Sequence, residues 1–486
     1  MRHEINQFII EGINYLKKND YLSSEKIFKK ALTKFPKGQI LYTYLLPCLI
    51  HQKKFEDALN YAKAFHKSGN MMEISSLYLG IIYFKMVQLE LSLKYFNISL
   101  KFNSRNYDTL VNKAAVLNKL DENEEAKKLL DNAIQINPNR NIAYRNYAAI
   151  YEDESNFYKA EEYYLNAIKI NPKDHQSIYD LSHIQLSQKK YSIGWKNYEH
   201  RWGRANVKYK YPQIKRLTNL EAVQGKKILI WSEQGMGDTI QFSRYVRHLI
   251  KIGAEVTFEV QGPLVDFLQD QFECKITSYA SDLNFDFQSP LLSLPAIFAN
   301  EELYFKFTGK YFDCSEEKYL FWREKLKKNS NKLNLGLTIS GNAQQINEDR
   351  RKISLKYFNK FADKFNIFII QKDISSEDKM IIEKNENMFF LGNNPHWKNF
   401  TDTSAILKNM DYIISVNTSI IHLAGSMNKR SLLLLSKPTD WRWAQDNNST
   451  PSWYKSLDIL RQKERRNWDT IQDDLEKILD KLSKEN

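Results

Sequence analysis

Three segments of the chain gather glycines, hydroxyls, cations and a carboxylate in an order that suits an anionic ligand. The first, residues 231–246, reads WSEQGMGDTIQFSRYV and directly follows a short apolar run. Gly235 and Gly237 permit a turn and close approach of the backbone, and Asp238 stands near the predicted start of a helix. This position suits a helix N-cap as well as a functional carboxylate. Because no third glycine completes a G-x-G-x-x-G fingerprint, a Rossmann dehydrogenase is disfavoured.

The second segment, residues 336–355, reads GLTISGNAQQINEDRRKISL. Gly341 and Asn342 predict a sharp turn after a strand, and three consecutive cations follow, from Arg350 to Lys352. Fixed guanidinium groups at such a place suit a phosphate. A solvated basic loop is the competing interpretation, and the sequence does not decide between Arg350 and Arg351.

The third segment, residues 411–435, reads DYIISVNTSIIHLAGSMNKRSLLLL. A buried strand is predicted to end at Asn417, and Thr418 and Ser419 then open a helix whose first backbone amides form an anion site. His422 lies one helical turn further, on the face that would meet the same anion. A lone histidine in an apolar helix is more often a packed one, and its position beside two hydroxyls is what favours a role at the site.

The elements that position these segments are alternating strands and helices that begin near residue 225. The predicted strands cover residues 227–231, 255–260, 334–339, 366–371, 412–416 and 431–435. This alternation predicts parallel sheets with ligand sites at the carboxyl ends of strands. A lysine-rich stretch near residues 322–334 separates two Rossmann-like halves, 225–330 and 331–486, the second ending in a helix.

The first 203 residues repeat with a period of 34. Pro36, Pro138 and Pro172 are spaced by 102 and 34 residues, which places a proline at equivalent helix exits. Small residues recur where paired helices must cross closely: Gly12, Ser24 and Ala31; Ala114, Ala126 and Ala133; and Ala148, Ala160 and Ala167. This is the tetratricopeptide pattern, and it predicts an α-helical solenoid of five to six repeats over residues 1–203.

The concave face of such a solenoid holds peptides or partner helices, so a protein partner is expected there. Tyrosines gather in the fifth repeat, and we expect them mostly in packing between helices rather than in a binding groove. They are Tyr144, Tyr147, Tyr151, Tyr158, Tyr163 and Tyr164.

Composition limits the remaining classes of function. The 486 residues carry a net charge of +13, but both parts of the chain share the excess, so nucleic acid is not an expected partner. Three distant cysteines predict neither disulfides nor a zinc site, and no apolar run is long enough to span a membrane. These features predict a soluble, cytoplasmic protein. The basic stretch at residues 201–217, overlapping a linker at 204–224, is expected to be solvated, with an anion-binding edge as the alternative.

In this order and spacing, the segments resemble bacterial proteins that join tetratricopeptide repeats to a glycosyltransferase domain related to the heptosyltransferases, glycosyltransferase family nine. The similarity is carried by GWKNYEHRW at 194–202, WSEQGMGDTIQFSRY at 231–245, SGN at 340–342, Arg351, Asp402 and Thr403, NTSIIHLAG at 417–425 and DWRW at 440–443. Such relatives usually carry aspartate where this chain has Asn417.

The resemblance implies a GT-B fold of two Rossmann-like domains, with the acceptor on the first and a nucleotide-sugar bound mainly by the second. It implies transfer with inversion and no metal or other cofactor. It makes Asp238 the general base and His422 a second catalytic residue. The residues implied for donor and phosphate binding are Gly235, Gly237, Ser340, Asn342, Arg351, Gln371, Asn417, Thr418, Ser419 and Trp441.

Three functions follow as hypotheses. The first is a glycosyltransferase whose repeats recruit a protein acceptor. The second is a non-catalytic repeat scaffold with a degenerate GT-B domain, because Asn417 departs from the family pattern. The third is a transferase for glycans or lipid-linked saccharides in which the repeats serve assembly. The sequence does not indicate the donor sugar or its nucleotide.

Overall fold

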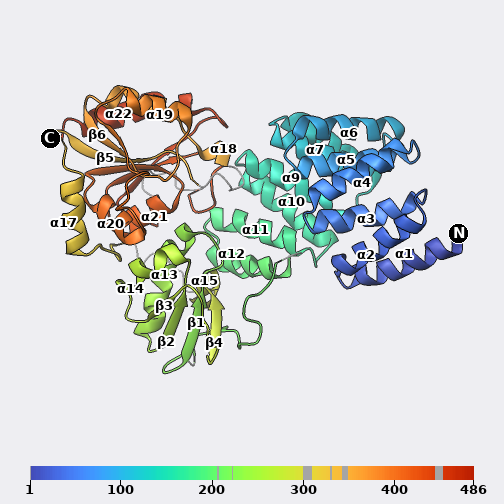
Figure 1. The fold of residues 1–486 in the computed structure, drawn as a ribbon, viewed down its shortest axis with the longest axis horizontal. Helices are drawn as coiled ribbons and strands as arrows, with labels where there is room; N and C mark the ends of the chain where they lie inside the picture. The colour runs from blue at the N-terminus through green and yellow to red at the C-terminus, as the bar shows by residue number, and fades with distance from the viewer. Residues whose placement is uncertain are drawn as a thin grey trace. The chain divides into compact units, whose positions relative to one another are not determined.

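The computed structural model describes residues 2–204, 207–221, 223–298, 309–328, 331–341, 348–443 and 453–485. The chain divides into two compact units, Met1–Ser177, called here the repeat unit, and Ile178–Asn486, called the sheet unit. Figure 1 shows helices alone in the first and two sheets with helices in the second. No helix within the described ranges has both the length and the apolar character needed to cross a bilayer.

The repeat unit is built from consecutive pairs of antiparallel helices. The pairs are α1 (Arg2–Lys17) with α2 (Tyr21–Lys34), α3 (Ile40–His51) with α4 (Phe55–Lys67), α5 (Met72–Lys85) with α6 (Leu89–Phe102), α7 (Tyr107–Lys119) with α8 (Asn123–Ile136), and α9 (Asn141–Asp153) with α10 (Phe157–Ile170). Side chains of Asp20, Asn106 and Asn156 cap three of these helices by accepting backbone N–H bonds. The predicted prolines follow α2, α8 and α10, so the period does mark the helix exits.

Small residues lie at the helix crossings as the period predicts. The alanines of the fourth and fifth repeats at these positions are at most 1% exposed. A Cβ on Gly12 would lie 2.2 Å from Phe28, and one on Gly80 would lie 2.5 Å from Phe96. Each glycine therefore lets an aromatic ring of the second helix touch the backbone of the first.

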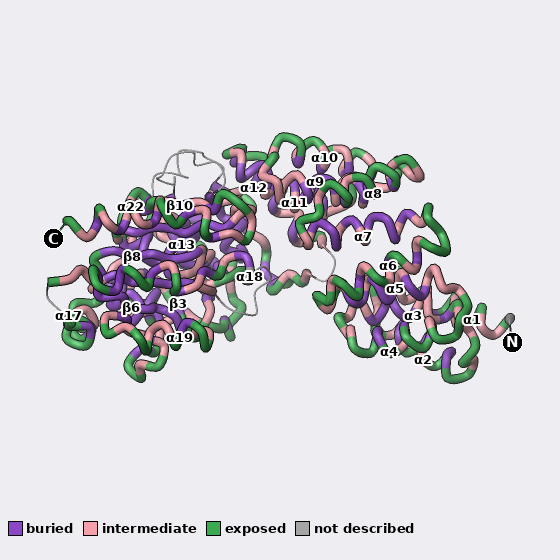
Figure 2. The backbone as a smooth tube through the Cα atoms, turned by 90° about the horizontal axis from the view of Figure 1, so that it is seen from above, coloured by how far each residue is buried: buried purple, intermediate pink, exposed green. Residues whose placement is uncertain are grey.

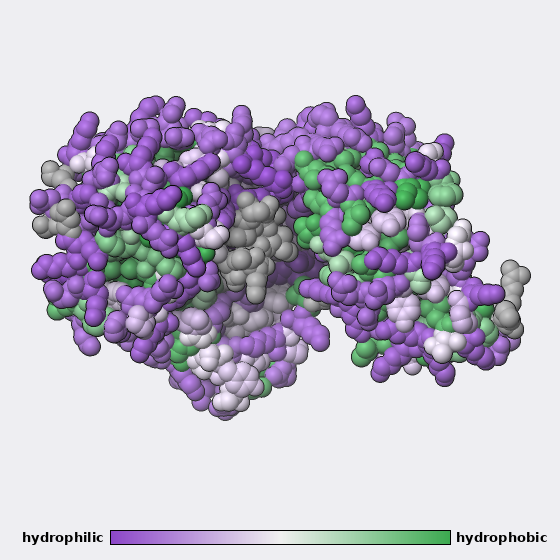
Figure 3. Space-filling model, turned by 45° about the horizontal axis from the view of Figure 1, so that its top comes forward, coloured by the Kyte–Doolittle hydropathy of each residue, from purple (hydrophilic) through white to green (hydrophobic). Residues whose placement is uncertain are grey.

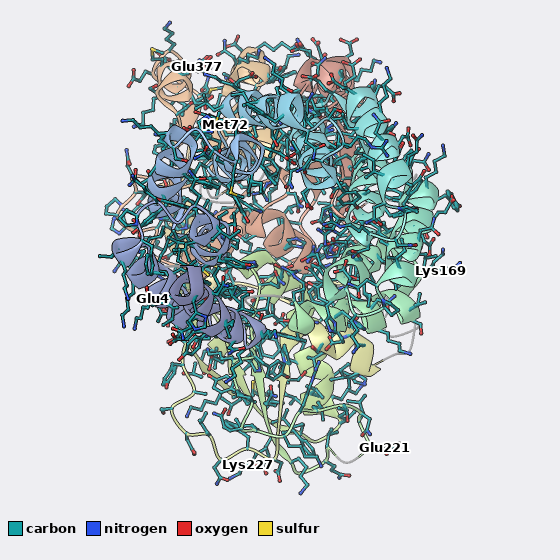
Figure 4. All side chains as sticks on the ribbon, turned by 90° about the vertical axis from the view of Figure 1, so that its right-hand side faces the viewer. Glu4, Met72, Lys169, Glu221, Lys227 and Glu377 are labelled. Atoms are coloured by element: carbon teal, nitrogen blue, oxygen red, sulfur yellow. The ribbon has the colours of Figure 1, made fainter. Side chains whose placement is uncertain are left out.

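Most of the clustered tyrosines pack between helices, as expected. Tyr147 and Tyr164 are buried, and the Tyr147 ring stacks on Tyr163 with centroids 4.6 Å apart. Tyr158 is the exception, at 78% exposed. Figure 3 shows separate hydrophobic areas among hydrophilic ones on the repeat unit, and exposed charged groups such as Lys169 of α10 are labelled in Figure 4.

The sheet unit contains two parallel sheets within its described residues. The smaller has the order β3-β2-β1-β4 and the larger β10-β9-β8-β5-β6-β7. The strands are β1 (Lys227–Trp231), β2 (Glu255–Glu259), β3 (Lys275–Thr277), β4 (Phe287–Pro290), β5 (Leu333–Thr338), β6 (Phe365–Ile369), β7 (Met388–Phe390), β8 (Tyr412–Val416), β9 (Ser431–Leu435) and β10 (Leu457–Arg461). The six predicted strands are present, and the sequence missed β3, β4, β7 and β10.

Helices cover both faces of the larger sheet. On one side α20 (Phe400–Lys408) and α21 (Ser419–Ser426) share a core with α13 (Met236–Lys251) of the smaller-sheet region. On the other side α19 (Ser376–Glu383) and α22 (Gln472–Leu482) form a separate core with alternate strand residues. Strands β6, β8 and β9 are accordingly wholly buried (Figure 2), whereas the edge strands β7 and β10 are buried only in part. Further helices are α14 (Val265–Gln269), α15 (Leu294–Phe298), α17 (Glu316–Lys325) and α18 (Glu348–Arg351). This region is a parallel α/β fold, as expected.

The last helix pair joins the two kinds of architecture. Helix α11 (His175–Ser187) crosses the boundary between the units, and α12 (Tyr191–Tyr198) lies in the sheet unit. The Trp195 ring of α12 contacts Phe242 of α13 edge-on, with centroids 5.6 Å apart. The sixth pair therefore contributes its core to the sheets.

The described residues of the basic stretch at 201–217 pack in part against the smaller sheet, which corrects the expectation of a solvated linker. Tyr211, Ile214 and Leu217 are buried against the smaller sheet. Leu217 N donates to Gln288 O and Gln288 N donates to Lys215 O, both at 2.9 Å, so residues 215–217 pair with β4 like a short extra strand. The packing follows from the sequence, in which apolar residues alternate with the cations. The apolar face of the stretch is buried, while the cations form ion pairs with carboxylates or lie over aromatic rings.

Candidate functional site

The sheet orders place the three sequence segments at crossover points. In the larger sheet β5 lies between β6 and β8, so the connections after β5 and β8 leave toward opposite faces. In the smaller sheet β1 lies between β2 and β4 in the same way. Ligands of open parallel sheets bind at such carboxyl ends. The three segments follow β1, β5 and β8, whereas Lys227 marks the opposite, amino end of β1 (Figure 4).

Gly237 brings the first and third segments together. A Cβ at this position would lie 2.9 Å from His422 Cδ2 and 3.4 Å from Ser419 Cα. Gly237 is the second residue of α13, and Ser419 is the first residue of α21. The first turns of two helices thus meet, and the positive ends of their dipoles lie close together. A negative charge is stabilised at such a junction.

Asp238 supplies part of that negative charge. Its Oδ2 accepts a hydrogen bond from the backbone N of Gly235 at 3.0 Å, and its Oδ1 forms an ion pair with Arg442. Gly235 is the N-cap of α13, so Asp238 closes the helix start from the third helical position rather than as the N-cap. Burial raises the pKa of Asp238, Arg442 lowers it, and the nearby Asp440 raises it again.

Arg442 is the cation that sequence reasoning missed, although it stands inside the quoted string DWRW. Besides Asp238 it contacts Asp440 at 3.2 Å, and its Nε donates to Gln241 Oε1 at 2.9 Å. Its guanidinium lies 4.3 Å from the ring centre of Trp441. Two carboxylates and two uncharged groups therefore fix this cation beside the meeting helix starts.

His422 is both packed and adjacent to the hydroxyl pair, so the two interpretations of this residue do not exclude each other. It is 5% exposed, its ring stacks on Trp443 with centroids 5.6 Å apart, and its Nδ1 lies 3.1 Å from the Tyr454 hydroxyl. Burial, helped by Arg442 and Arg244, lowers the pKa of His422 to about 3. The imidazole is neutral at physiological pH and offers hydrogen bonds rather than charge.

The residues at the end of β8 form hydrogen bonds both with each other's neighbours and with distant parts of the chain. Thr418 Oγ1 lies 3.1 Å from Ser415 Oγ and caps no backbone N–H, although Thr418 is the N-cap of α21. The Asn417 side chain accepts from Trp443 Nε1 at 3.3 Å, and the Asn417 carbonyl accepts from Arg351 Nη1 at 3.0 Å. Arg351, one of the two candidate arginines, therefore contacts this loop.

The segment after β5 is tied to β6 by Gln371. The Gln371 side chain accepts from Ile339 N at 2.9 Å and donates to Ser340 Oγ at 3.1 Å. Gln371 thus positions Ser340 and is itself buried. Asn342 lies outside the described residues. Gly235 is exposed at the start of α13.

Two residues of the family-like pattern serve packing. Asp402 is buried and accepts from Lys318 at 2.9 Å and Trp322 Nε1 at 3.2 Å, both on α17. Thr403 accepts from Trp397 Nε1 at 2.8 Å. The Asp402 bonds fix α17 on α20, whereas the Thr403 bond holds the segment just before α20. None of these bonds is made with a residue of α13 or α21.

The tryptophans of DWRW differ in burial. Trp443 is fully buried beside His422. Trp441 is half-buried, with its ring edge-on to Trp195 at a centroid distance of 5.5 Å. Packing is therefore the observed role of Trp443, while one side of Trp441 remains accessible.

A buried ion pair anchors the loop after β1. Arg201 Nη2 donates to Glu233 Oε1 at 3.0 Å and to Ser293 Oγ at 2.7 Å, and Leu292 N donates to the same glutamate oxygen at 3.2 Å. Burial raises the pKa of Glu233. The pair links the loops after β1 and β4, and sequence reasoning missed it because its members are 32 residues apart.

The described residues contain no group of three or more histidine, cysteine, aspartate or glutamate side chains arranged to hold a metal ion. The cations and helix starts at the junction suit an anion instead. Arg442, Arg351 and the amides after Thr418 are the groups that would hold it.

Comparison with known proteins identifies the repeats. The tetratricopeptide repeat family profile matches residues 107–140 and 143–174, both inside the repeat unit. A thermophilic tetratricopeptide-repeat protein of Thermus thermophilus is similar at 16% identity and a TM-score of 0.36, over 37% of this chain and 99% of that one. A tetratricopeptide repeat protein of Parabacteroides merdae matches at 17% identity and a TM-score of 0.33, over 42% of this chain and 81% of that one. A chain of the APC/C hetero-tetramer Cut9-Hcn1 is similar at 14% identity and a TM-score of 0.38, over 42% of this chain and 41% of that one.

Proposed function

We propose that the chain is a metal-independent inverting glycosyltransferase with a GT-B arrangement of its two parallel sheets. The observation that carries this proposal is the contact of Gly237 with Ser419 and His422. It puts Asp238, the start of α21 and two arginines at neighbouring carboxyl ends of two parallel sheets.

The charges of the junction fit the chemistry of a nucleotide-sugar donor. In an inverting transfer the acceptor oxygen attacks the anomeric carbon while the bond from that carbon to the diphosphate oxygen breaks. The diphosphate takes up negative charge, which the helix starts, Arg442 and Arg351 stabilise. The acceptor proton passes to Asp238. Burial favours this step because it raises the pKa of that carboxyl.

The repeats indicate that the acceptor of the proposed transfer is a protein. Tetratricopeptide solenoids bind protein segments, and a repeat unit attached to a transferase has an evident task if the acceptor is a protein. We therefore propose that the repeat unit recruits the protein that is glycosylated.

A thermal-shift screen against nucleoside diphosphates and nucleotide sugars tests the proposal. A ligand at 100 times its dissociation constant adds about 2.7 kcal/mol to the free energy of unfolding. With a donor identified, Asp238→Asn is expected to retain donor binding and to lose about 10²- to 10⁴-fold in transfer rate. Asp282→Asn, in an exposed loop, is the matched control and should retain both donor binding and the transfer rate. If no nucleotide raises the melting temperature, the enzyme proposal fails.

A non-catalytic scaffold is the second candidate, and specific contacts favour it. Arg442 already neutralises Asp238, and Asn417 is held by Trp443. Under this alternative the repeats alone carry function. Cells that carry Asp238→Asn would then show an unchanged partner-dependent phenotype, whereas the enzyme proposal requires its loss.

A further inference from the structure

The imidazole of His422 is held on several sides by groups that leave it little freedom. Gly237 lies against its Cδ2 edge, and Trp443 stacks on its face. Tyr454 meets Nδ1 through its hydroxyl, and the Tyr454 ring lies so close to α21 that a Cβ on Gly425 would be 2.4 Å away. The two glycines thus make room for the imidazole and for the phenol that contacts it.

A neutral imidazole carries one N–H and one acceptor nitrogen, and its partners decide which is which. At His422 the Nδ1 side is occupied by Tyr454. The Nε2 side faces Gly237, whose Cβ would lie 3.7 Å from that nitrogen. The hydrogen of the Tyr454 hydroxyl therefore determines what Nε2 presents to the meeting helix starts.

The surroundings of Tyr454 indicate where its hydrogen goes. Arg244, a buried guanidinium that can only donate, lies 5.3 Å from the Tyr454 ring centre. Arg244 Nη2 donates to the Tyr311 hydroxyl at 3.1 Å, and Tyr311 uses its own hydrogen on Ile240 O at 3.2 Å. Both neighbours of Tyr454 thus direct hydrogens of their own, and burial raises the pKa of Tyr454, so its phenol stays protonated. The Tyr311 hydroxyl is also within hydrogen-bonding reach of Tyr454, but its oxygen already accepts from Arg244. The basic imine nitrogen of His422, 3.1 Å away, is the stronger acceptor.

We infer that Tyr454 is a positioning residue that donates its hydroxyl hydrogen to Nδ1 of His422 and so holds the imidazole as the Nε2–H tautomer. This inference rests on the proposed function for its purpose: Nε2–H is then a neutral donor to the departing diphosphate. A donor fixed in advance stabilises developing charge without a proton changing hands.

The tautomer is measured directly by long-range ¹H–¹⁵N correlation spectra of the full chain labelled with ¹⁵N-histidine. His422→Gln identifies the signals by difference. The wild type at pH 7 is expected to show the Nε2–H pattern for this residue. Tyr454→Phe, which keeps the ring against Gly425, is expected to move the signals toward a mixture of tautomers. Tyr357→Phe removes a phenol that donates to Asp469 far along the chain and should leave them unchanged.

An Nδ1–H pattern or an imidazolium in the wild type overturns the inference, and so does an unchanged spectrum in Tyr454→Phe. The first of these outcomes is read on the wild-type protein, with His422→Gln used only to assign its signals, so a folding defect in Tyr454→Phe cannot hide it.

Calorimetric titration with inorganic pyrophosphate separates this inference from the proposed function. If both hold, Tyr454→Phe weakens pyrophosphate binding about two- to tenfold, because a net hydrogen bond of about 0.5–1.5 kcal/mol is lost, and Tyr357→Phe does not. If the wild type shows the Tyr454-dependent Nε2–H tautomer but binds no pyrophosphate, the proposed function fails and the positioning role of Tyr454 stands. Wild-type binding that Tyr454→Phe leaves unchanged removes the role assigned to the tautomer.

Discussion

Replacing Gly237 by alanine tests the contact on which the site depends. The new methyl group would lie 2.9 Å from His422 Cδ2, well inside ordinary van der Waals contact. The ring cannot turn away freely, because Trp443 and Tyr454 hold it. Overpacking of this kind costs about 1–3 kcal/mol, and the gain in helix propensity from glycine to alanine returns at most about 1 kcal/mol. We expect a net loss of about 1–2 kcal/mol.

Tryptophan fluorescence during urea unfolding is the appropriate assay. All nine tryptophans follow residue 177, so the signal reports the sheet unit alone. Gly262→Ala is the matched control, because no described heavy atom lies within 4 Å of a Cβ at that position. It should change stability by less than about 0.5 kcal/mol. Equal stabilities of the Gly237 and Gly262 variants would refute the packing of Gly237 against His422.

Three further predictions concern charge and packing. Arg442→Met removes a cation that lowers the pKa of Asp238 and of His422, so both pKa values should rise in NMR titrations. His422 has a folded pKa of about 3 against 6.5 for the free side chain, so the unfolded chain binds more protons between these values. Stability conferred by its neutral form is complete above pH 6.5 and falls as pH decreases toward 3, by at most about 1.4 kcal/mol per pH unit, and His422→Gln should lack this slope in urea unfolding. Gly80→Ala forces a methyl group onto Phe96 and should destabilise the repeat unit by about 1–3 kcal/mol, measured by circular dichroism.

Each of these three predictions has a control or an outcome that would contradict it. Arg430→Met removes an exposed cation paired with Glu485 and should shift neither the Asp238 nor the His422 titration. A wild-type stability that does not fall faster than that of His422→Gln below pH 6.5 contradicts the buried neutral imidazole. Gly80→Ala should leave the unfolding transition seen by tryptophan fluorescence unchanged. A shift in that transition, with no change in the unfolding seen by circular dichroism, contradicts the packing of Gly80 against Phe96.

The repeats were predictable because one close crossing recurs in every helix pair. Small residues recur at the 34-residue period in most of the pairs, and a proline follows α2, α8 and α10, so the period marks where these helices end. Strands at the centre of the sheets were predictable for a similar reason, since burial on both faces demands an unbroken apolar run, as in β8 and β9. The missed strands β3 and β7 have three residues each, β4 contains glutamine and proline, and β10 carries charged residues at a sheet edge.

The candidate site was predictable only in part. The start of a helix directly after a strand can be predicted from a short stretch of sequence, and this is why Asp238 and Ser419 were found. The partners of these residues come from distant parts of the chain: Arg442 is 204 residues from Asp238, and Tyr454 is 32 residues from His422. No local spacing encodes such contacts. Asp402 helps to carry the resemblance, and the structure places it in the packing of α17 on α20.

The stretch that lies along β4 has a practical consequence for dissecting the chain. Without residues 215–217 the free edge of β4 would offer unpaired backbone groups to other molecules, a known route to aggregation. Loss of α12 would in addition uncover Phe242 on α13. A truncated protein meant to isolate the sheets should therefore begin near Ile178, and one that begins at Gly225 is expected to precipitate.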